Sequence, residues 1–196
     1  SLGSINPIHK LTHMAHKYGA LVLVDGAQAI AHMPIDVTSL GVDFYCFSSH
    51  KLFGPTGVGV LYGKKNILET MSPYKGGGDM IKSVTFDKTI YNDIPYRFEA
   101  GTPHIAGVIG FGAAIDWVLN IGLQKISKYE QWILFKATEA LSKISGVRII
   151  GTAKEKSAII SFIVEGIHSH DIGTIADQYG FAVCYPNGTI DQSNNR

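Results

Sequence analysis

The hydrophobic pattern of the first third of the chain predicts one helix followed by two short strands. Apolar side chains recur at helical spacing between Asn6 and Gly19, with Asn6 expected as the N-cap and Pro7 in the first turn. Two apolar runs follow, over residues 21–25 and 42–47, and both are rich in β-branched or aromatic residues, which strands favour. This order predicts an α/β sheet of mostly buried strands.

The pattern beyond residue 56 predicts further strands and two long helices. Residues 105–121 hold many small side chains, which suits close packing, and residues 126–144 repeat apolar positions at steps of three and four. The expected elements are a returning strand over 57–63, a short helix over 64–71, a surface loop or hairpin over 79–96, these two helices, strands over 147–150 and 158–164, a helix over 170–179 and a strand over 181–183. We expect two domains, residues 1–116 and 117–196.

Composition narrows the class of protein. The chain has 196 residues, 45% of them hydrophobic, which is enough to bury a sizeable core. The 17 basic and 16 acidic residues nearly balance, so neither nucleic acid nor a membrane surface is an expected partner. No apolar run approaches the roughly 20 residues of a membrane span, and no signal-peptide pattern is present. The expected location is the cytoplasm.

The cysteines and histidines do not suggest a metal site. Cys46 and Cys184 show neither disulfide density nor metal-binding spacing. His9, His13 and His16 recur at helical spacing, but no nearby carboxylate or cysteine completes a ligand set. We expect these histidines to form a solvated helix face, and we expect no bound metal.

The most informative stretch is the end of the second strand, where the apolar run stops on Ser48, Ser49, His50 and Lys51. Burial of a lysine beside a strand would disfavour its charged form and lower its pKa, which makes the amine a nucleophile toward carbonyl groups. The alternative is a lysine that extends from the strand end into water. This stretch alone leaves both interpretations open.

The strand upstream ends in Asp25 and Gly26. In an open α/β sheet the carboxyl ends of neighbouring strands face a common crevice, so Asp25 and Lys51 are expected to meet there. A simple ion pair would satisfy this arrangement. A carboxylate beneath a pyridinium nitrogen, with a lysine on the aldehyde, is also the arrangement of pyridoxal phosphate enzymes.

Three motifs carry a resemblance to a known family. They are Asp25-Gly26-Ala27-Gln28, the run SSHKLFGPTG over residues 48–57, and RFEAGTP over residues 97–103. On these motifs the chain resembles the cysteine desulfurases of the class V aminotransferase family, in the selenocysteine-lyase-like branch. The resemblance implies the PLP-dependent transferase fold type I. Residues 1–116 would then be the C-terminal part of the cofactor-binding large domain, and residues 117–196 a small α/β domain that is incomplete at its C-terminus.

The resemblance also implies roles for individual residues. Lys51 would hold pyridoxal 5'-phosphate covalently and move protons at the substrate α carbon. Asp25 would keep the pyridine nitrogen protonated, and Gln28 would hydrogen-bond the ring hydroxyl.

The phosphate ligands implied by the resemblance come from two subunits. Ser48 and His50 would bind the phosphate together with the partner subunit's Thr102, which makes a homodimer part of the site. Ser49 stands where the family commonly has glycine, a change that we do not expect to abolish cofactor binding.

The resemblance fails in the loop after residues 181–183. In the family this loop begins Arg-Thr-Gly and reaches a cysteine whose thiolate takes sulfur from the substrate. Counting without gaps, Cys184 stands at the position of the arginine and Thr189 at that of the nucleophile. The polar tail over 191–196 resembles no part of the family. A frameshift near residues 186–188 is one hypothesis for this departure.

The sequence therefore predicts a truncated PLP-dependent cysteine desulfurase. Such an enzyme converts L-cysteine to L-alanine and passes the sulfur, through an enzyme persulfide, to an acceptor protein for iron-sulfur cluster assembly. A selenocysteine lyase or another class V aminotransferase is the alternative within the same class. An inactive remnant that only binds a partner subunit is the alternative from another class.

Overall fold

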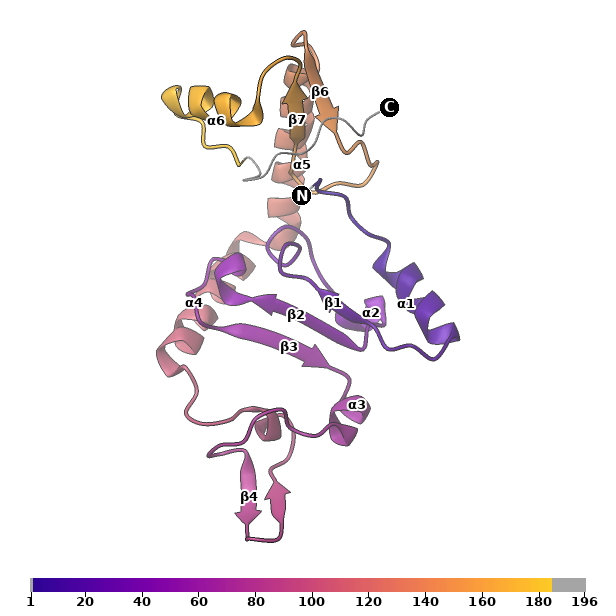
Figure 1. Cartoon of the computed structure of the whole chain (residues 1–196), viewed down its shortest axis with the longest axis vertical. Helices are drawn as coiled ribbons and strands as arrows, with labels where there is room; N and C mark the ends of the chain where they lie inside the picture. Colours follow the sequence, from indigo (N-terminus) through magenta and orange to yellow (C-terminus); the bar gives the residue numbers. More distant parts are fainter. Residues whose placement is uncertain (1, 185–196) are drawn as a thin grey trace. The chain divides into compact units, whose positions relative to one another are not determined.

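The computed structural model describes residues 2–184 (Figure 1). Its contacts form two compact units, of which one is Asn6–Lys128 and the other combines the N-terminal residues through Ile5 with the chain from Tyr129 onward. The border between them falls within helix α5 (Leu123–Leu141). The border expected after residue 116 lies inside helix α4 (Ile105–Ile121).

The first unit is built on a three-stranded sheet in the order β1-β2-β3. Strand β1 (Leu23–Asp25) runs parallel to β2 (Phe44–Ser48), and β3 (Gly59–Gly63) returns antiparallel beside β2. The parallel register pairs Asp25 with Cys46. All three predicted strands are confirmed, including the return of the third beside the lysine-bearing strand.

Helix α4 covers one face of this sheet, as Figure 1 shows. Phe47 of β2 meets Phe111 of α4 edge to face, with ring centroids 6.3 Å apart. On the alternate face, Leu23 and Leu61 are 58% and 57% exposed. The prediction of mostly buried strands is wrong for the described chain, because its helices leave these two side chains open. The buried core cluster consists of Ala31, Leu52, Phe111 and Val118.

Three shorter helices flank the sheet: α1 (Ile8–Lys17), α2 (Val37–Leu40) and α3 (Lys65–Thr70). The predicted helices near residues 6–19 and 64–71 are confirmed. Asn6 as N-cap is wrong, because Pro7 occupies the cap position with ψ at 66° and helical geometry begins only after it. Helix α2 was not predicted, although the Asp36 carboxylate caps it by accepting from the amides of Thr38 and Ser39.

A hairpin forms where the sequence predicted a loop or hairpin. Strands β4 (Ile81–Val84) and β5 (Thr89–Tyr91) pair antiparallel and extend away from the three-stranded sheet (Figure 1). Arg97 lies in the short 3-10 helix Tyr96–Phe98 that follows. Its Nε donates to the Asn92 carbonyl at 3.1 Å, so Arg97 ties the base of the hairpin to the segment before α4.

The second unit contains most of α5, an antiparallel pair β6 (Val147–Ile150) and β7 (Ser161–Val164), and α6 (Ser169–Gln178). The N-terminal residues join it, because the Ser157 amide donates to the Gly3 carbonyl at 2.8 Å. The strand predicted over 181–183 is wrong: this segment is irregular and has no ladder partner within residues 2–184.

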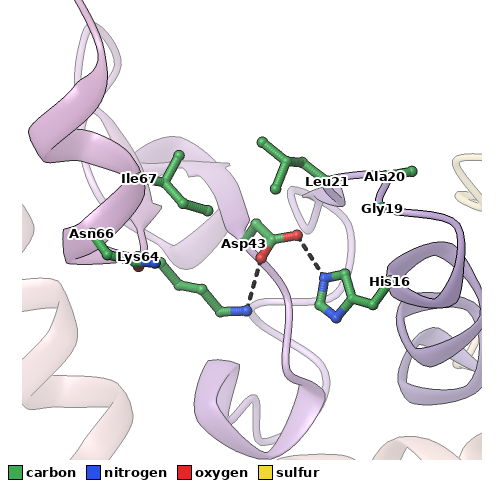
Figure 2. Close-up of a pocket in the computed structure, with 8 residues that line it drawn as sticks. All are labelled: His16, Gly19, Ala20, Leu21, Asp43, Lys64, Asn66 and Ile67. Carbon is green, nitrogen blue, oxygen red and sulfur yellow. Dashed lines mark hydrogen bonds and ion pairs between the residues drawn. The ribbon is translucent and has the colours of Figure 1, made fainter.

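A buried carboxylate anchors the amino end of β2. Asp43 is 3% exposed and lies directly before the strand. It accepts from the Val22 amide at 2.7 Å, from His16 Nε2 at 2.8 Å and from Lys64 Nζ at 2.7 Å. Figure 2 shows the two side-chain bonds, beside a shallow pocket of about 320 Å³. Asp43 thus joins α1, the entry to β1 and the segment between β3 and α3.

This network corrects the prediction that His16 lies on a purely solvated helix face. The pKa of Asp43 also reflects it. Burial alone would raise that pKa, but the hydrogen bonds from Lys64, His16 and the Val22 amide, with the charge of Lys64, outweigh burial and lower it to about 2.

We predict that Asp43→Asn destabilises the full-length protein by roughly 3 kcal/mol at pH 7, because it removes the charge that Lys64 faces in a buried site. The pKa of Asp43 is depressed in the folded state, so its stabilisation is complete above about pH 4 and is lost as the pH falls through 2. The stability difference between parent and variant should therefore narrow by about 1 kcal/mol between pH 5 and pH 3 in urea unfolding.

Asp93→Asn is the matched control. Asp93 also pairs with a lysine at 2.8 Å, Lys82, but its side chain is 79% exposed. Water screens such a pair, so we expect a much smaller effect. Equal losses from the two substitutions would show that burial of Asp43 is not what makes its network stabilising.

Candidate active site

The carboxyl ends of β1 and β2 bring the first site residues together. Gly26, directly after β1, donates its amide to the Cys46 carbonyl at 2.8 Å and so continues the parallel pairing past Asp25. The Ala27 amide donates to Oδ1 of Asp25 at 3.0 Å, which fixes the turn around the carboxylate. Asp25 is exposed, and its second oxygen makes no hydrogen bond within residues 2–184. One carboxylate oxygen is thus available to a ligand.

The lysine lies just beyond β2, in the short 3-10 helix Ser49–Leu52. Lys51 is exposed and makes no ion pair or hydrogen bond to any other described residue. The burial that would activate this lysine is therefore not found in the described chain. Beside it, Ser48 Oγ and His50 Nδ1 are hydrogen-bonded at 2.9 Å. Ser48, His50 and Lys51 therefore present a hydroxyl, an imidazole and an amine at one strand end.

Ser49 points away from these groups. It is fully buried, and its Oγ donates to the Pro55 carbonyl at 2.7 Å, so the hydroxyl is used within the turn. Gly54 packs against it: a Cβ on Gly54 would lie 2.4 Å from Ser49 Oγ and 2.8 Å from the Phe111 ring. The serine found in place of the family's glycine therefore reinforces the loop and does not enter the site.

Glycines of α4 allow this loop to approach the helix closely. A Cβ on Gly107 would lie 2.8 Å from the side chain of Val58, and one on Gly110 would lie 3.4 Å from Pro55. The predicted small-residue helix is thereby confirmed in its extent and in its close packing. The core thus holds the turn after Lys51 in place through α4.

Two predicted ligands lie at the edges of the site. Gln28 is exposed in the turn after β1, two residues beyond Gly26. Thr102 is exposed in the loop before α4, next to Gly101, whose φ of +83° is a backbone conformation suited to glycine. Within residues 2–184, Thr102 makes no hydrogen bond to the other five predicted residues. Its expected role in a partner subunit stays a prediction.

Sequence reasoning missed Tyr45, which lies beneath the Asp25 turn. Its ring is 2% exposed, and a Cβ on Gly26 would fall 1.9 Å from Cζ and from the hydroxyl oxygen of Tyr45. The hydroxyl is buried and has no hydrogen-bond partner within the described chain. Burial, and then the charges of Asp25 and Cys46, raise the pKa of Tyr45. The signal in the sequence was the glycine that directly follows the acid, but it does not identify the tyrosine as its neighbour.

The chemistry of the residues present fits pyridoxal phosphate. The ligand needs an amine for its aldehyde, an anion for its ring nitrogen and donors for its phosphate. Lys51, Asp25 and the Ser48–His50 pair supply these groups at adjoining strand ends, and all four side chains are at least partly open to solvent. Residues 2–184 contain no group of three or more His, Cys, Asp or Glu side chains that could hold a metal ion.

Among residues 2–184, no single helix is both long and apolar enough to cross a bilayer, and α4 and α5 reach that length and composition only as a bent pair.

An α/β fold with a lysine, a carboxylate and hydrogen-bonding groups for a phosphate at the strand ends defines a class of group-transfer proteins. Residues 1–188 match the family described as aminotransferase class V, and the chain belongs to this family. The predicted family is confirmed. The match ends at residue 188, so the polar tail over 191–196 lies outside it, as does Thr189. Thr189 and the tail also lie outside the described residues.

The chain is similar to proteins named as cysteine desulfurases. It is 49% identical over 183 residues to the cysteine desulfurase of Synechococcus elongatus, covering 93% of this chain and 29% of that protein. It is 48% identical to a probable cysteine desulfurase of Xylella fastidiosa, covering 93% of this chain and 44% of that protein. The chain thus spans less than half the length of these relatives.

Solved structures confirm the predicted fold. The crystal structure of an Escherichia coli cysteine desulfurase in its S-sulfonic acid form matches 92% of this chain and 45% of its own, with 41% identity and a TM-score of 0.86. The fold is therefore that of part of a PLP-dependent transferase of fold type I, as expected.

We predict that Ser49→Ala costs about 1–2 kcal/mol of stability, because it leaves the Pro55 carbonyl without its hydroxyl donor in a buried turn. Urea unfolding of the full-length protein measures this loss. Ser142→Ala is the matched control, since Ser142 Oγ donates to the Thr138 carbonyl at the same 2.7 Å but is exposed. A loss at Ser49 no larger than at Ser142 would contradict a structural role for the buried hydroxyl.

Proposed function

We propose that the full-length protein containing this chain is a PLP-dependent cysteine desulfurase. The observation that carries this proposal is the 48–49% identity to proteins of that name over 93% of the chain, together with the group of Asp25, Ser48, His50 and Lys51 at adjoining strand ends. The reaction converts L-cysteine to L-alanine and transfers the sulfur to the enzyme and then to an acceptor protein, for iron-sulfur cluster assembly. A cytoplasmic location is part of the same proposal.

Each predicted site residue of this chain has a role in the proposed reaction that follows from its position. Lys51 would hold the cofactor through its amine and would move the proton at the substrate α carbon. Asp25 would offer its free oxygen to the ring nitrogen and keep it protonated. The Ser48–His50 pair would bind the phosphate, and Gln28 would bind the ring hydroxyl. The cofactor would supply an electron sink for the bond that breaks.

The exposure of Lys51 is consistent with this role. A buried amine with fixed partners would have to break them to reach an aldehyde, whereas Lys51 has none to break within residues 2–184. Reactivity then depends on the groups gathered around the amine when the cofactor is present, and not on burial of the lysine by this chain alone.

A second candidate is a selenocysteine lyase or another class V enzyme that lacks a sulfur-accepting cysteine. The observation that favours it is the departure after residue 183. Cys184 stands where the family has an arginine, so the proposal assigns no cysteine of this chain as the sulfur acceptor. Turnover of L-cysteine against L-selenocysteine by the full-length protein separates the two candidates.

We predict that the full-length protein binds pyridoxal phosphate with a visible absorption band, and that borohydride fixes the cofactor to Lys51. Lys51→Ala should abolish the covalent adduct found by mass spectrometry and the turnover of L-cysteine. Lys65→Ala is the control, because Lys65 is the first residue of α3 and its side chain is 79% exposed. An adduct that persists in Lys51→Ala would exclude the proposed attachment site.

We further propose that the partner subunit's Thr102 completes the phosphate site in a homodimer. Lys51→Ala and Thr102→Val homodimers should each lack a tight covalent site. A mixed dimer of the two variants should regain one such site, because Lys51 of one subunit then meets the intact Thr102 of the other. If Thr102 acts within its own subunit, mixing will restore none. Titration of the mixed dimer with pyridoxal phosphate distinguishes the outcomes.

A further inference from the structure

The buried hydroxyl of Tyr45 has no place in the functions described so far. A hydroxyl that is buried without a partner costs about 1–3 kcal/mol relative to one that is satisfied. The phenol ring could pack in β2 equally well without its oxygen, as phenylalanine. A buried polar group that lacks a partner in a folded protein needs an explanation, and a role at a functional site is one such explanation.

The position of this hydroxyl suggests the explanation. Its oxygen lies against Gly26, close enough that any side chain there would collide with it. Gly26 is held from the other direction by its amide bond to Cys46, and the adjacent Ala27 amide fixes Oδ1 of Asp25. Tyr45, the pairing of β1 with β2 and the Asp25 turn therefore form one packed unit. We therefore expect a change at the hydroxyl to alter the direction in which the carboxylate points.

We propose that Tyr45 is a positioning residue for Asp25: its buried ring and hydroxyl support the Asp25–Gly26 turn and so fix the direction of the carboxylate. The inference rests on the proposed function, because it concerns the carboxylate that meets the ring nitrogen. Burial first, and the negative charge of Asp25 second, raise the pKa of Tyr45. The hydroxyl makes no hydrogen bond within residues 2–184, so its observed contact with the turn is the packing against Gly26.

The direction of the carboxylate matters because Asp25 has one free oxygen for the ring nitrogen. Loss of the hydroxyl should therefore weaken cofactor binding and change its pH dependence, while the packed ring keeps the fold intact.

The test compares Tyr45→Phe with Tyr62→Phe in the full-length protein. Tyr62 lies directly opposite Tyr45 on β3, so its variant removes a hydroxyl from the same sheet without touching Gly26. For Tyr45→Phe we expect unchanged or higher thermal stability without cofactor, and a Kd for pyridoxal phosphate about tenfold higher than that of the parent. We also expect a shift in the pH profile of the visible band. Tyr62→Phe should change none of these.

A double-mutant cycle with Asp25→Asn tests whether Tyr45 acts through Asp25. The tenfold effect of Tyr45→Phe should disappear in the Asp25→Asn background, because the carboxylate that Tyr45 positions is gone. Effects that multiply independently would overturn the inference, as would an unchanged Kd or a destabilised apo protein. If the parent itself forms no Lys51-dependent complex, the proposed function fails and this inference fails with it. A failure of the inference alone leaves the parent's complex intact.

Discussion

The pairing of β2 with two neighbours is the constraint on which the rest of the first unit depends. Parallel pairing with β1 places Asp25 level with Cys46, only two residues before Ser48 on the next strand. Antiparallel pairing with β3 returns the chain from the lysine loop along the other edge of β2. The carboxylate and the lysine, which are 26 residues apart in sequence, reach neighbouring strand ends because of this register. A shift of one residue would move Asp25 to the opposite face of the sheet.

The loop that carries Lys51 is held by packing and not by its functional groups. Ser49 is bonded inside the turn, Leu52 belongs to the buried core, and Gly54 fits against Phe111 with no room for a side chain. The buried Ser49 and Leu52 flank the exposed pair His50 and Lys51. In this loop, some residues hold the backbone in place and others carry the reactive side chains. The polar groups are therefore free to contact a ligand while the backbone stays fixed.

Much of this arrangement was predictable, and the failures have identifiable physical causes. Strong periodicity and turn residues located the strands and the long helices, and the motifs around Asp25 and Lys51 indicated the family. Burial was mispredicted because an apolar run such as residues 21–25 shows only which side chains a strand is able to bury. Whether they are buried depends on the elements that cover them, and the described elements leave Leu23 exposed. The contacts of His16 and Tyr45 were missed for a related reason. Their partners, Asp43 and Gly26, are distant in sequence, and helical or strand spacing carries no information about contacts made through the tertiary fold.

Asp25 and Asp43 show how the fold assigns different tasks to the same side chain. Asp43 precedes β2, is buried and accepts from three donors, so its charge is fully used in holding α1 and the segment after β3. Asp25 is the last residue of β1, is exposed and accepts from one amide, so half of its carboxylate is left for a ligand. The environment of each carboxylate, and not its residue type, determines whether its charge stabilises the fold or is available to a ligand. The sheet places them at opposite ends of its strands, and so the ionic network that stabilises the fold does not compete for the groups that the chemistry needs.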